Sequence, residues 1–227
     1  MERKEAVRSA YRMTGGNNFY DGMITCSTLS GKAVCRLVWA MNKAECGDYL
    51  EKALSGIPEN FSGRLLEVPV GTGVLTMPVY QTLPKADITC LDYSPDMMKQ
   101  AQEKADRLRL KNVTFRQGDV GALPYEDGSF DIVLSLNGFH AFPDKEAAYR
   151  EVFRVLKPGG TFCGCFYIKG ENKRTDWFVR HIYEKAGFFT PPYETVSSLK
   201  ARLDGMYTDV DMGNLKSMVW FVCRKAG

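Results

Sequence analysis

The stretch that decides the fold reads Leu65-Leu66-Glu67-Val68-Pro69-Val70-Gly71-Thr72-Gly73. It begins as a short apolar run, which predicts a buried strand, and ends in two glycines, which predict a tight turn. Glycines after a strand let the backbone approach a ligand closely where the next helix begins. Taken alone, Gly71-Thr72-Gly73 is a weak signal, because a tight turn without a ligand has the same pattern.

Between Arg64 and Lys169 the chain alternates short β-rich runs with longer stretches of helical periodicity. The β-rich runs lie at 65–68, 88–91, 113–115, 132–134 and 161–166. The clearest helix spans Pro95–Leu110, where apolar residues recur along one side and Ser94 provides an N-cap. A second helix spans Lys145–Leu156, and Pro158-Gly159-Gly160 stops it. Strands that alternate with helices imply right-handed crossovers and a mostly parallel sheet.

Two regions flank this core. Residues 1–60 hold helix-like material at 33–44 and 47–54, which predicts a helical N-terminal cap. Two strand-like runs, Tyr207–Met212 and Ser217–Cys223, close the chain and would add antiparallel edge strands. We therefore expect an α/β fold with a Rossmann-like, doubly wound, mostly parallel seven-stranded sheet that includes an antiparallel C-terminal strand.

Composition excludes several classes of protein. The 227 residues are 44% hydrophobic, which is too apolar for a disordered chain, and no apolar run is long enough to predict a membrane span. A formal net charge of +3 without a long basic run argues against a nucleic-acid partner. The charged N-terminus lacks the apolar region of a signal peptide, so we expect a cytoplasmic protein. The sequence carries no signal for an oligomeric state.

The seven cysteines include no CxxC pair, and reduced thiols are expected throughout. Cys163 and Cys165 face the same way in a predicted strand. Buried structural thiols explain this pair better than a metal or redox site.

Two further strand ends each carry a carboxylate. Asp92 follows the glycines by about twenty residues, where a carboxylate can accept hydrogen bonds from both hydroxyls of a ribose. A charge that favours the next helix is the alternative, but Ser94 already caps that helix. At the third strand end, Asp119 can accept from an adenine amino group while an adjacent backbone N–H meets a ring nitrogen. Three consecutive strand ends therefore point at one adenosine-shaped crevice.

The residues that are missing from the glycine turn reduce the number of candidate ligands. A nicotinamide dinucleotide needs a third glycine three residues after Gly73, and here that position is Thr76. A Walker-type Gly-Lys-Ser/Thr is missing as well. We expect an adenosine that carries a compact charged tail.

Residues 64–168 resemble the core of a class I S-adenosylmethionine-dependent methyltransferase, most closely the type 11 group that includes the ubiquinone/menaquinone-biosynthesis C-methyltransferases. The resemblance rests on Leu66–Gly73, Leu91–Met98, Gly118–Tyr125, Ser129–Val133 and Glu151–Gly160, in family order and spacing. It covers a little under half of the chain. It implies S-adenosyl-L-methionine as cofactor, S-adenosyl-L-homocysteine as product, and methyl transfer to a small-molecule acceptor.

The resemblance implies roles for the first strand end. Glu67 and the backbone of Gly71, Thr72 and Gly73 would surround the methionine moiety. Thr76 matches a position that often touches the cofactor.

The later strand ends would bind the rest of the cofactor. Asp92 would hold the ribose, and Tyr93 would lie on one face of the adenine. Asp119 and Val120 would read the adenine edge. Ser135–Asn137 would border the amino-acid tail and the methyl group.

One departure from the family keeps a second function open. The family usually has glycine where Pro69 stands, and proline contributes no N–H to the methionine tail. Pro69 favours a methyltransferase-like module that binds the cofactor without catalysis. The intact Asp92 and Asp119 favour an enzyme.

Methyl transfer from a sulfonium is an in-line displacement for which the cofactor carries the activation. His140 lies just past the fourth strand and is the candidate general base, with packing of that loop as the alternative. Tyr20, in Phe19-Tyr20-Asp21, resembles an N-terminal tyrosine that lies near the methyl group. A helix-capping Asp21 beside a buried ring is the alternative there. His140 and Tyr20 are therefore the candidate catalytic residues, and we expect no metal site.

In this family the acceptor is usually selected by the N-terminal segment and by the insertion after strand five. Here these are the cap at 1–60 and, within a methyltransferase domain at 61–227, the insertion at 170–206. Their aromatic residues are Trp39, Trp177, Phe178, Tyr183, Phe188, Phe189 and Tyr193. They favour an aromatic or apolar acceptor, although a second core cluster would have the same composition.

Overall fold

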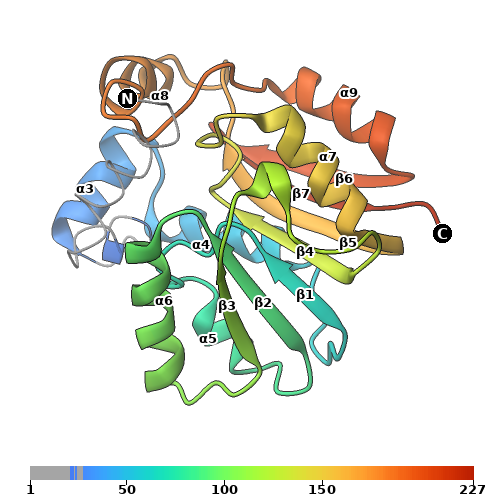
Figure 1. The fold of residues 1–227 in the computed structure, drawn as a ribbon. Helices are drawn as coiled ribbons and strands as arrows, with labels where there is room; N and C mark the ends of the chain where they lie inside the picture. The colour runs from blue at the N-terminus through green and yellow to red at the C-terminus, as the bar shows by residue number, and fades with distance from the viewer. Residues whose placement is uncertain (1–20, 23, 25–27) are drawn as a thin grey trace.

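A seven-stranded sheet forms the centre of the computed structural model (Figure 1), which describes residues 21, 22, 24 and 28–227. The strands are β1 (Arg64–Glu67), β2 (Asp87–Asp92), β3 (Val113–Gln117), β4 (Phe130–Leu136), β5 (Leu156–Tyr167), β6 (Asp209–Leu215) and β7 (Met218–Arg224). Their spatial order is β3-β2-β1-β4-β5-β7-β6. Strands β1 to β5 pair in parallel, and β7 pairs antiparallel with both β5 and β6.

The predicted Rossmann-like sheet with its antiparallel C-terminal strand is confirmed. The hairpin differs from the prediction in one respect, because β7 is not an edge strand. It lies between β5 and β6, and β6 forms the edge. The strand order reverses between β1 and β4, which is where an open α/β sheet leaves a crevice for a ligand.

The two faces of the sheet are covered by different helices. The described helices are α3 (Leu29–Leu37), α4 (Lys43–Leu54), α5 (Met77–Tyr80), α6 (Pro95–Arg107), α7 (Lys145–Val155), α8 (Lys173–Phe178) and α9 (Val196–Met206). A 3-10 turn, η1 (Val120–Ala122), and a π-helical turn, η2 (Val179–Tyr183), complete them. Leu65 and Ile132 belong to the core cluster that α4, α5 and α6 join, whereas Leu66 and Val133 belong to the cluster that α7 and α9 join. Successive residues along a strand thus pack on opposite faces of the sheet. Because both faces are covered, the strands appear in the sequence as continuous apolar runs.

Two helices start or stop where local chemistry dictates. Ser94 Oγ accepts from the Met97 N–H at 3.4 Å, so the predicted cap of α6 is confirmed. The sequence predicts one helix at 33–44. In the structure α3 ends at Leu37 and α4 begins at Lys43, so the prediction is wrong for the residues between them. Asn42 begins α4 there with a capping box, in which its side chain accepts from Glu45 N–H while Glu45 accepts from its own.

The cysteines confirm one prediction and correct another. Cys163 and Cys165 are free and fully buried in β5, as structural thiols. Cys46, Cys90 and Cys223 are also buried, and they form no disulfide. Cys35 is disulfide-bonded, so the expectation of reduced thiols throughout is wrong for this residue.

β4 and β5 lie very close together at Gly164. This predicts that one added methyl group there strongly lowers the stability of the protein. A Cβ at Gly164 would lie 2.0 Å from the Ser135 carbonyl oxygen, which cannot move without breaking the ladder. Gly164→Ala is expected to lower the free energy of unfolding by roughly 2 kcal/mol or more. Gly205→Ala, in α9 with open space around its Cβ, is the control and should raise it by about 0.5–1 kcal/mol. Urea unfolding monitored by circular dichroism compares them, and equal stabilities would contradict the close packing.

Candidate cofactor site

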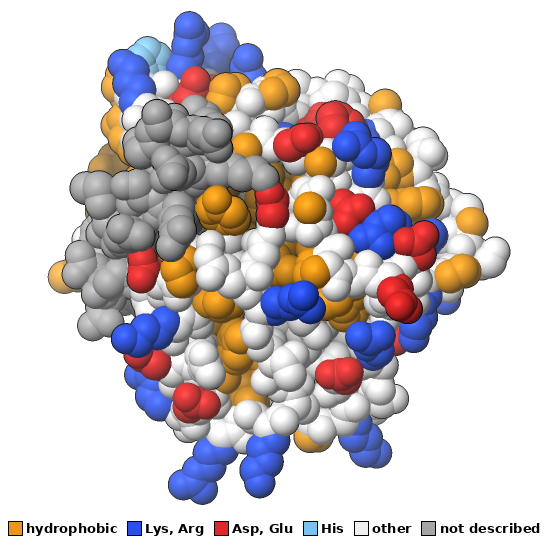
Figure 2. Space-filling model, viewed as in Figure 1, with side chains coloured by type: hydrophobic (Ala, Val, Ile, Leu, Met, Phe, Trp, Pro, Cys, Tyr) orange, Lys and Arg blue, Asp and Glu red, His pale blue; other side chains and the backbone are white. Residues whose placement is uncertain are grey.

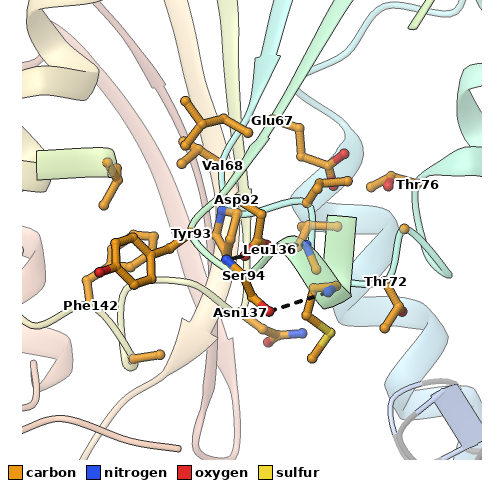
Figure 3. Close-up of a pocket in the computed structure, with 18 of the residues that line it drawn as sticks. Glu67, Val68, Thr72, Thr76, Asp92, Tyr93, Ser94, Leu136, Asn137 and Phe142 are labelled. Atoms are coloured by element: carbon orange, nitrogen blue, oxygen red, sulfur yellow. Dashed lines mark hydrogen bonds between the residues drawn. The ribbon is translucent and has the colours of Figure 1, made fainter. Parts of the chain in front are cut away.

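A cleft opens at the carboxyl ends of β1, β2, β3 and β4 (Figure 3). Its lining consists of Ile24, Glu67–Thr76, Leu91–Ser94, Met97, Gly118–Val120, Leu136, Asn137 and Ala141–Pro143. The cleft lies at the reversal of strand order, so fold and cavity select the same place.

The turn after β1 forms one wall of the cleft. Gly71 and Gly73 have φ of +56° and +67°, values that side-chain-bearing residues rarely adopt. A Cβ at Gly71 would meet open space, so this side of the turn faces the cavity. A Cβ at Gly73 would lie 2.9 Å from Met77 Cγ and 3.1 Å from Ala101 Cβ. Gly73 is therefore needed for packing as well as for the turn.

Asp92 joins the first two strand ends. It is buried, and its Oδ2 accepts from the Gly71 N–H while its Oδ1 accepts from the Ser94 N–H, both at 2.8 Å. Burial raises the pKa of Asp92 to about 6, and the backbone N–H donors oppose that shift. A carboxylate can accept about four hydrogen bonds, so capacity remains for two hydroxyls.

Glu67 is a fully buried carboxyl at the wall of the same cleft. Its Oε2 accepts from Tyr80 Oη at 2.9 Å and from Cys90 Sγ at 3.5 Å. Burial raises the pKa of Glu67 to about 8, while the Tyr80 hydrogen bond acts in the opposite direction. At neutral pH the ligand-free site therefore holds Glu67 mostly protonated. A ligand cation beside it would favour the charged form.

The adenine side of the site is assembled by the third strand end. Asp119 Oδ1 accepts from the Gly121 N–H at 2.9 Å, which starts the turn η1. Val120 is buried, and Tyr93 is 38% exposed at the rim of the cleft. Asp119, Val120 and Tyr93 all line the cleft. An adenine base bound between these residues requires this arrangement.

A segment far away in the sequence also reaches the glycine turn. Thr72 Oγ1 donates to Asp21 Oδ1 at 2.6 Å, and Lys104 of α6 pairs with Asp21 Oδ2 at 3.0 Å. Ile24 adds an apolar side chain to the cleft. The N-terminal segment thus contributes to this wall through Asp21 and Ile24.

Two of the predicted site residues, Ser135 and His140, do not line the cleft, and the position of a third is not described. Ser135 is buried inside β4 and does not line the cleft, whereas Asn137, with a φ of +56°, does. Tyr20 lies outside the described residues. His140 also does not line the cleft.

The surroundings of His140 are those of a packing residue. Its Nδ1 accepts from the Tyr167 N–H at 3.2 Å, and its ring stacks on Phe189 with centroids 4.0 Å apart. Burial lowers the pKa of His140 to about 3, so the ring is neutral at physiological pH. This geometry matches the alternative of loop packing, and we do not retain His140 as a general base.

The loop after β4 supplies lining residues that sequence reasoning missed. These are Ala141, Phe142 and Pro143, which form an apolar side of the cleft together with Leu136 at the end of β4. The sequence shows an aromatic loop at this point, but not which of its side chains point inward. Ser94 and Met97 were noticed only as a cap and as part of a helix stripe.

Pro69 fits the cleft without displacing the turn. The Val68–Pro69 peptide bond is cis, and Pro69 lines the cleft. A Cβ at Gly138 would lie 2.4 Å from Pro69 Cδ, so a glycine in the β4 loop accommodates the proline ring.

The predicted aromatic roof is largely a packed cluster. Trp39 lies within 6.1 Å, between ring centroids, of Tyr167, Tyr183 and Phe189. Among the described residues, none of the predicted roof aromatics lines the cleft. The contacts therefore match the alternative of a second core cluster.

The sheet order, the glycine turn and the acidic strand ends together define the class of S-adenosylmethionine-dependent methyltransferases. The protein family described as "Methyltransferase domain" matches residues 62–195, more than half of the chain, and the chain belongs to this family. The predicted resemblance to class I methyltransferases is confirmed.

Three known proteins illustrate the similarity. A demethylmenaquinone methyltransferase from Thermus thermophilus is 40% identical over 97 residues, which cover 43% of this chain and 44% of the relative. The chloroplastic 2-methyl-6-phytyl-1,4-hydroquinone methyltransferase 2 of Oryza sativa is 34% identical over 137 residues, 60% of this chain and 37% of the relative. The matched stretch is thus less than half the length of each relative. One chain of a complex that contains the Haloferax volcanii Trm112 methyltransferase activator aligns with a TM-score of 0.72 at 18% identity. That alignment covers 97% of this chain and 98% of the other, and it supports the fold.

The residues present fit S-adenosylmethionine. Asp92 retains acceptor capacity for ribose hydroxyls, and Gly71 leaves open space on the cavity side of the turn. Glu67 offers a buried carboxyl on the same wall, suited to a cationic tail.

The buried Glu67 predicts a pH-dependent stability of the ligand-free protein. Because its pKa rises from 4.5 unfolded to about 8 folded, the folded state holds an extra proton across that window, and stability falls as pH rises through it. Glu67→Gln removes this loss and should stabilise the protein at pH 8, by roughly 2–4 kcal/mol more than at pH 5.

Thermal unfolding at both pH values measures the difference. Glu103→Gln, on the exposed side of α6, is the control and should change little. Parallel pH profiles for the wild type and Glu67→Gln would mean that Glu67 is ionised in the ligand-free protein.

Proposed function

We propose that this protein transfers a methyl group from S-adenosyl-L-methionine to a small apolar acceptor by in-line displacement. The observation that carries the proposal is the convergence of two buried carboxyls, Glu67 and Asp92, on a cleft walled by the glycine turn. The family to which the chain belongs supports the same reaction.

The bound cofactor would supply a methyl group already activated by its sulfonium. Asp92 would accept from the ribose hydroxyls, and Glu67 would balance the charge of the methionine end once it ionises. Asp119 and Tyr93 would hold the adenine. Val68, Leu136 and Phe142, which Figure 3 places around the cavity, would exclude water from the reacting atoms.

The acceptor follows from the apolar side of the cleft. Leu136, Ala141, Phe142 and Pro143 favour an aromatic or apolar molecule, and the matched relatives are named for quinone and hydroquinone substrates. The described lining contains no histidine, lysine or cysteine. An acceptor that binds as its phenolate or quinolate anion has already given up its proton to the solvent and would need no such base. Of the two segments expected to select it, residues 1–60 reach the described lining through Ile24, whereas the predicted roof aromatics of 170–206 do not line the cleft.

The alternative of a module without catalysis rested on Pro69. The glycine turn keeps its positive φ angles beside this proline, and Gly138 makes room for the ring. The turn around Pro69 therefore offers nothing that favours the alternative, whose other ground was the lack of an obvious base.

We propose the cytoplasm as the compartment. Five of the described cysteines are buried and form no disulfide, which suits a reducing environment, whereas the disulfide-bonded Cys35 does not. None of the described helices has the length and apolarity to cross a bilayer.

Calorimetric titration with S-adenosylmethionine tests the binding step. Asp92→Asn keeps the size of the side chain, but its amide nitrogen cannot accept from the Gly71 or the Ser94 N–H. The change therefore weakens the turn as well as the hydrogen bonds to the ribose, and we expect a 10- to 100-fold lower affinity, about 1.5–3 kcal/mol. Asp204→Asn, which removes an exposed pairing with Lys200 on α9, is the control and should bind like the wild type.

Release of S-adenosylhomocysteine with a panel of quinols and phenols tests the reaction. Binding without any release across the panel would favour the module. No binding at millimolar cofactor would refute both.

A further inference from the structure

One surface of the molecule combines exposed apolar and cationic side chains. It is formed by α3 and by the stretch from α8 to Lys185, and we call it the α3–α8 face. Its exposed apolar residues are Leu29, Leu37, Trp177 and Ile182, at 87%, 60%, 53% and 47% exposure. Its exposed cations are Lys32, Arg36, Lys173, Arg174, Arg180 and Lys185. Figure 2 shows Lys and Arg side chains gathered beside hydrophobic ones at the corner where α8 lies in Figure 1.

The two elements of this face are fixed to each other. Arg174 Nη2 donates to the Arg36 carbonyl oxygen at 3.0 Å, and the buried Thr175 Oγ1 donates to the Val38 carbonyl oxygen at 2.6 Å. The side chains on α3 and α8 therefore form one surface and not two independent ones.

The charge of the face is strongly one-sided. Two acidic residues occur in its α8 stretch, and both are already hydrogen-bonded. Asp176 accepts from Tyr167 Oη and from the Gly170 N–H, and Glu184 accepts from Tyr193 Oη. The whole chain carries a formal charge of only +3, so the cations of this face are a local concentration.

Four of the five large hydrophobic side chains that are exposed in the described chain lie on this face; the fifth, Tyr93, is at the cofactor cleft. Exposed Trp, Leu and Ile among Lys and Arg form the pattern of an interfacial, membrane-surface element. The indole ring suits the headgroup level, and the cations suit anionic phosphates.

We propose that the α3–α8 face docks on the surface of a lipid bilayer that contains anionic headgroups. The apolar side chains would enter the headgroup boundary while the surrounding cations contact lipid phosphates. This is peripheral binding without a membrane span.

The face is connected to the wall of the cofactor cleft. Trp39, just after α3, packs on Phe189, and Phe189 stacks on His140, whose neighbour Ala141 lines the cleft. Docking would therefore bring the cleft close to an acceptor dissolved in the bilayer. This last step rests on the proposed function, but the docking itself does not.

Co-sedimentation with vesicles tests the docking. The protein should pellet with phosphatidylcholine vesicles that contain 40% phosphatidylglycerol, and not with pure phosphatidylcholine. The triple variant Lys173→Glu/Arg180→Glu/Lys185→Glu should bind at least tenfold more weakly. The control variant Lys85→Glu/Lys99→Glu/Lys111→Glu has the same net charge, with its exposed changes away from the face, and should bind like the wild type.

Tryptophan fluorescence tests the apolar part. Anionic vesicles should shift the emission to shorter wavelength, and Trp177→Phe should abolish most of that shift. Absence of pelleting, or equal binding by the two triple variants, would overturn the proposal. So would self-association that depends on Trp177, since the face would then bind a second copy. Cofactor titration of the same variants separates the two proposals, because docking variants should bind S-adenosylmethionine normally.

Discussion

The cofactor site depends on one carboxylate that accepts hydrogen bonds from two backbone segments and holds them side by side. Asp92, at the end of β2, accepts the N–H groups of Gly71 and Ser94. The first bond holds the glycine turn after β1, and the second fixes the start of α6. Because β1 and β2 are neighbours in a parallel sheet, their ends meet at one edge, and Asp92 sets the distance between them. A residue that would contact the ligand thus also shapes the wall around it.

Glu67 presents a different constraint. It is buried at the wall of the cleft with Tyr80 and Cys90 as partners, and almost none of its surface is in contact with solvent that would support its charge. Burial without a ligand disfavours the ionised form of Glu67. A cationic ligand beside it lowers the free energy of that ionisation. The protein gives up stability to hold a carboxyl where a sulfonium-bearing amino acid would need one.

Much of the fold could be predicted because its signals are local. The strand runs, the Ser94 cap and the spacing from Gly71 to Asp92 lie within short windows of sequence. The surroundings of His140 could not be predicted, since they are made by Tyr167 and Phe189, which come much later in the chain. The position of Asp21 against Thr72 is also a long-range contact that no local pattern encodes. The break before Asn42 is encoded locally, by the capping box that Asn42 and Glu45 form.

The place of β7 has a consequence for the order of assembly. β6 precedes β7 along the chain, yet it reaches the sheet only through β7. During synthesis on a ribosome, β6 emerges first but has no partner strand until β7 has followed it out. β6 therefore joins the sheet either with β7, as a preformed hairpin, or after it, although it is translated first.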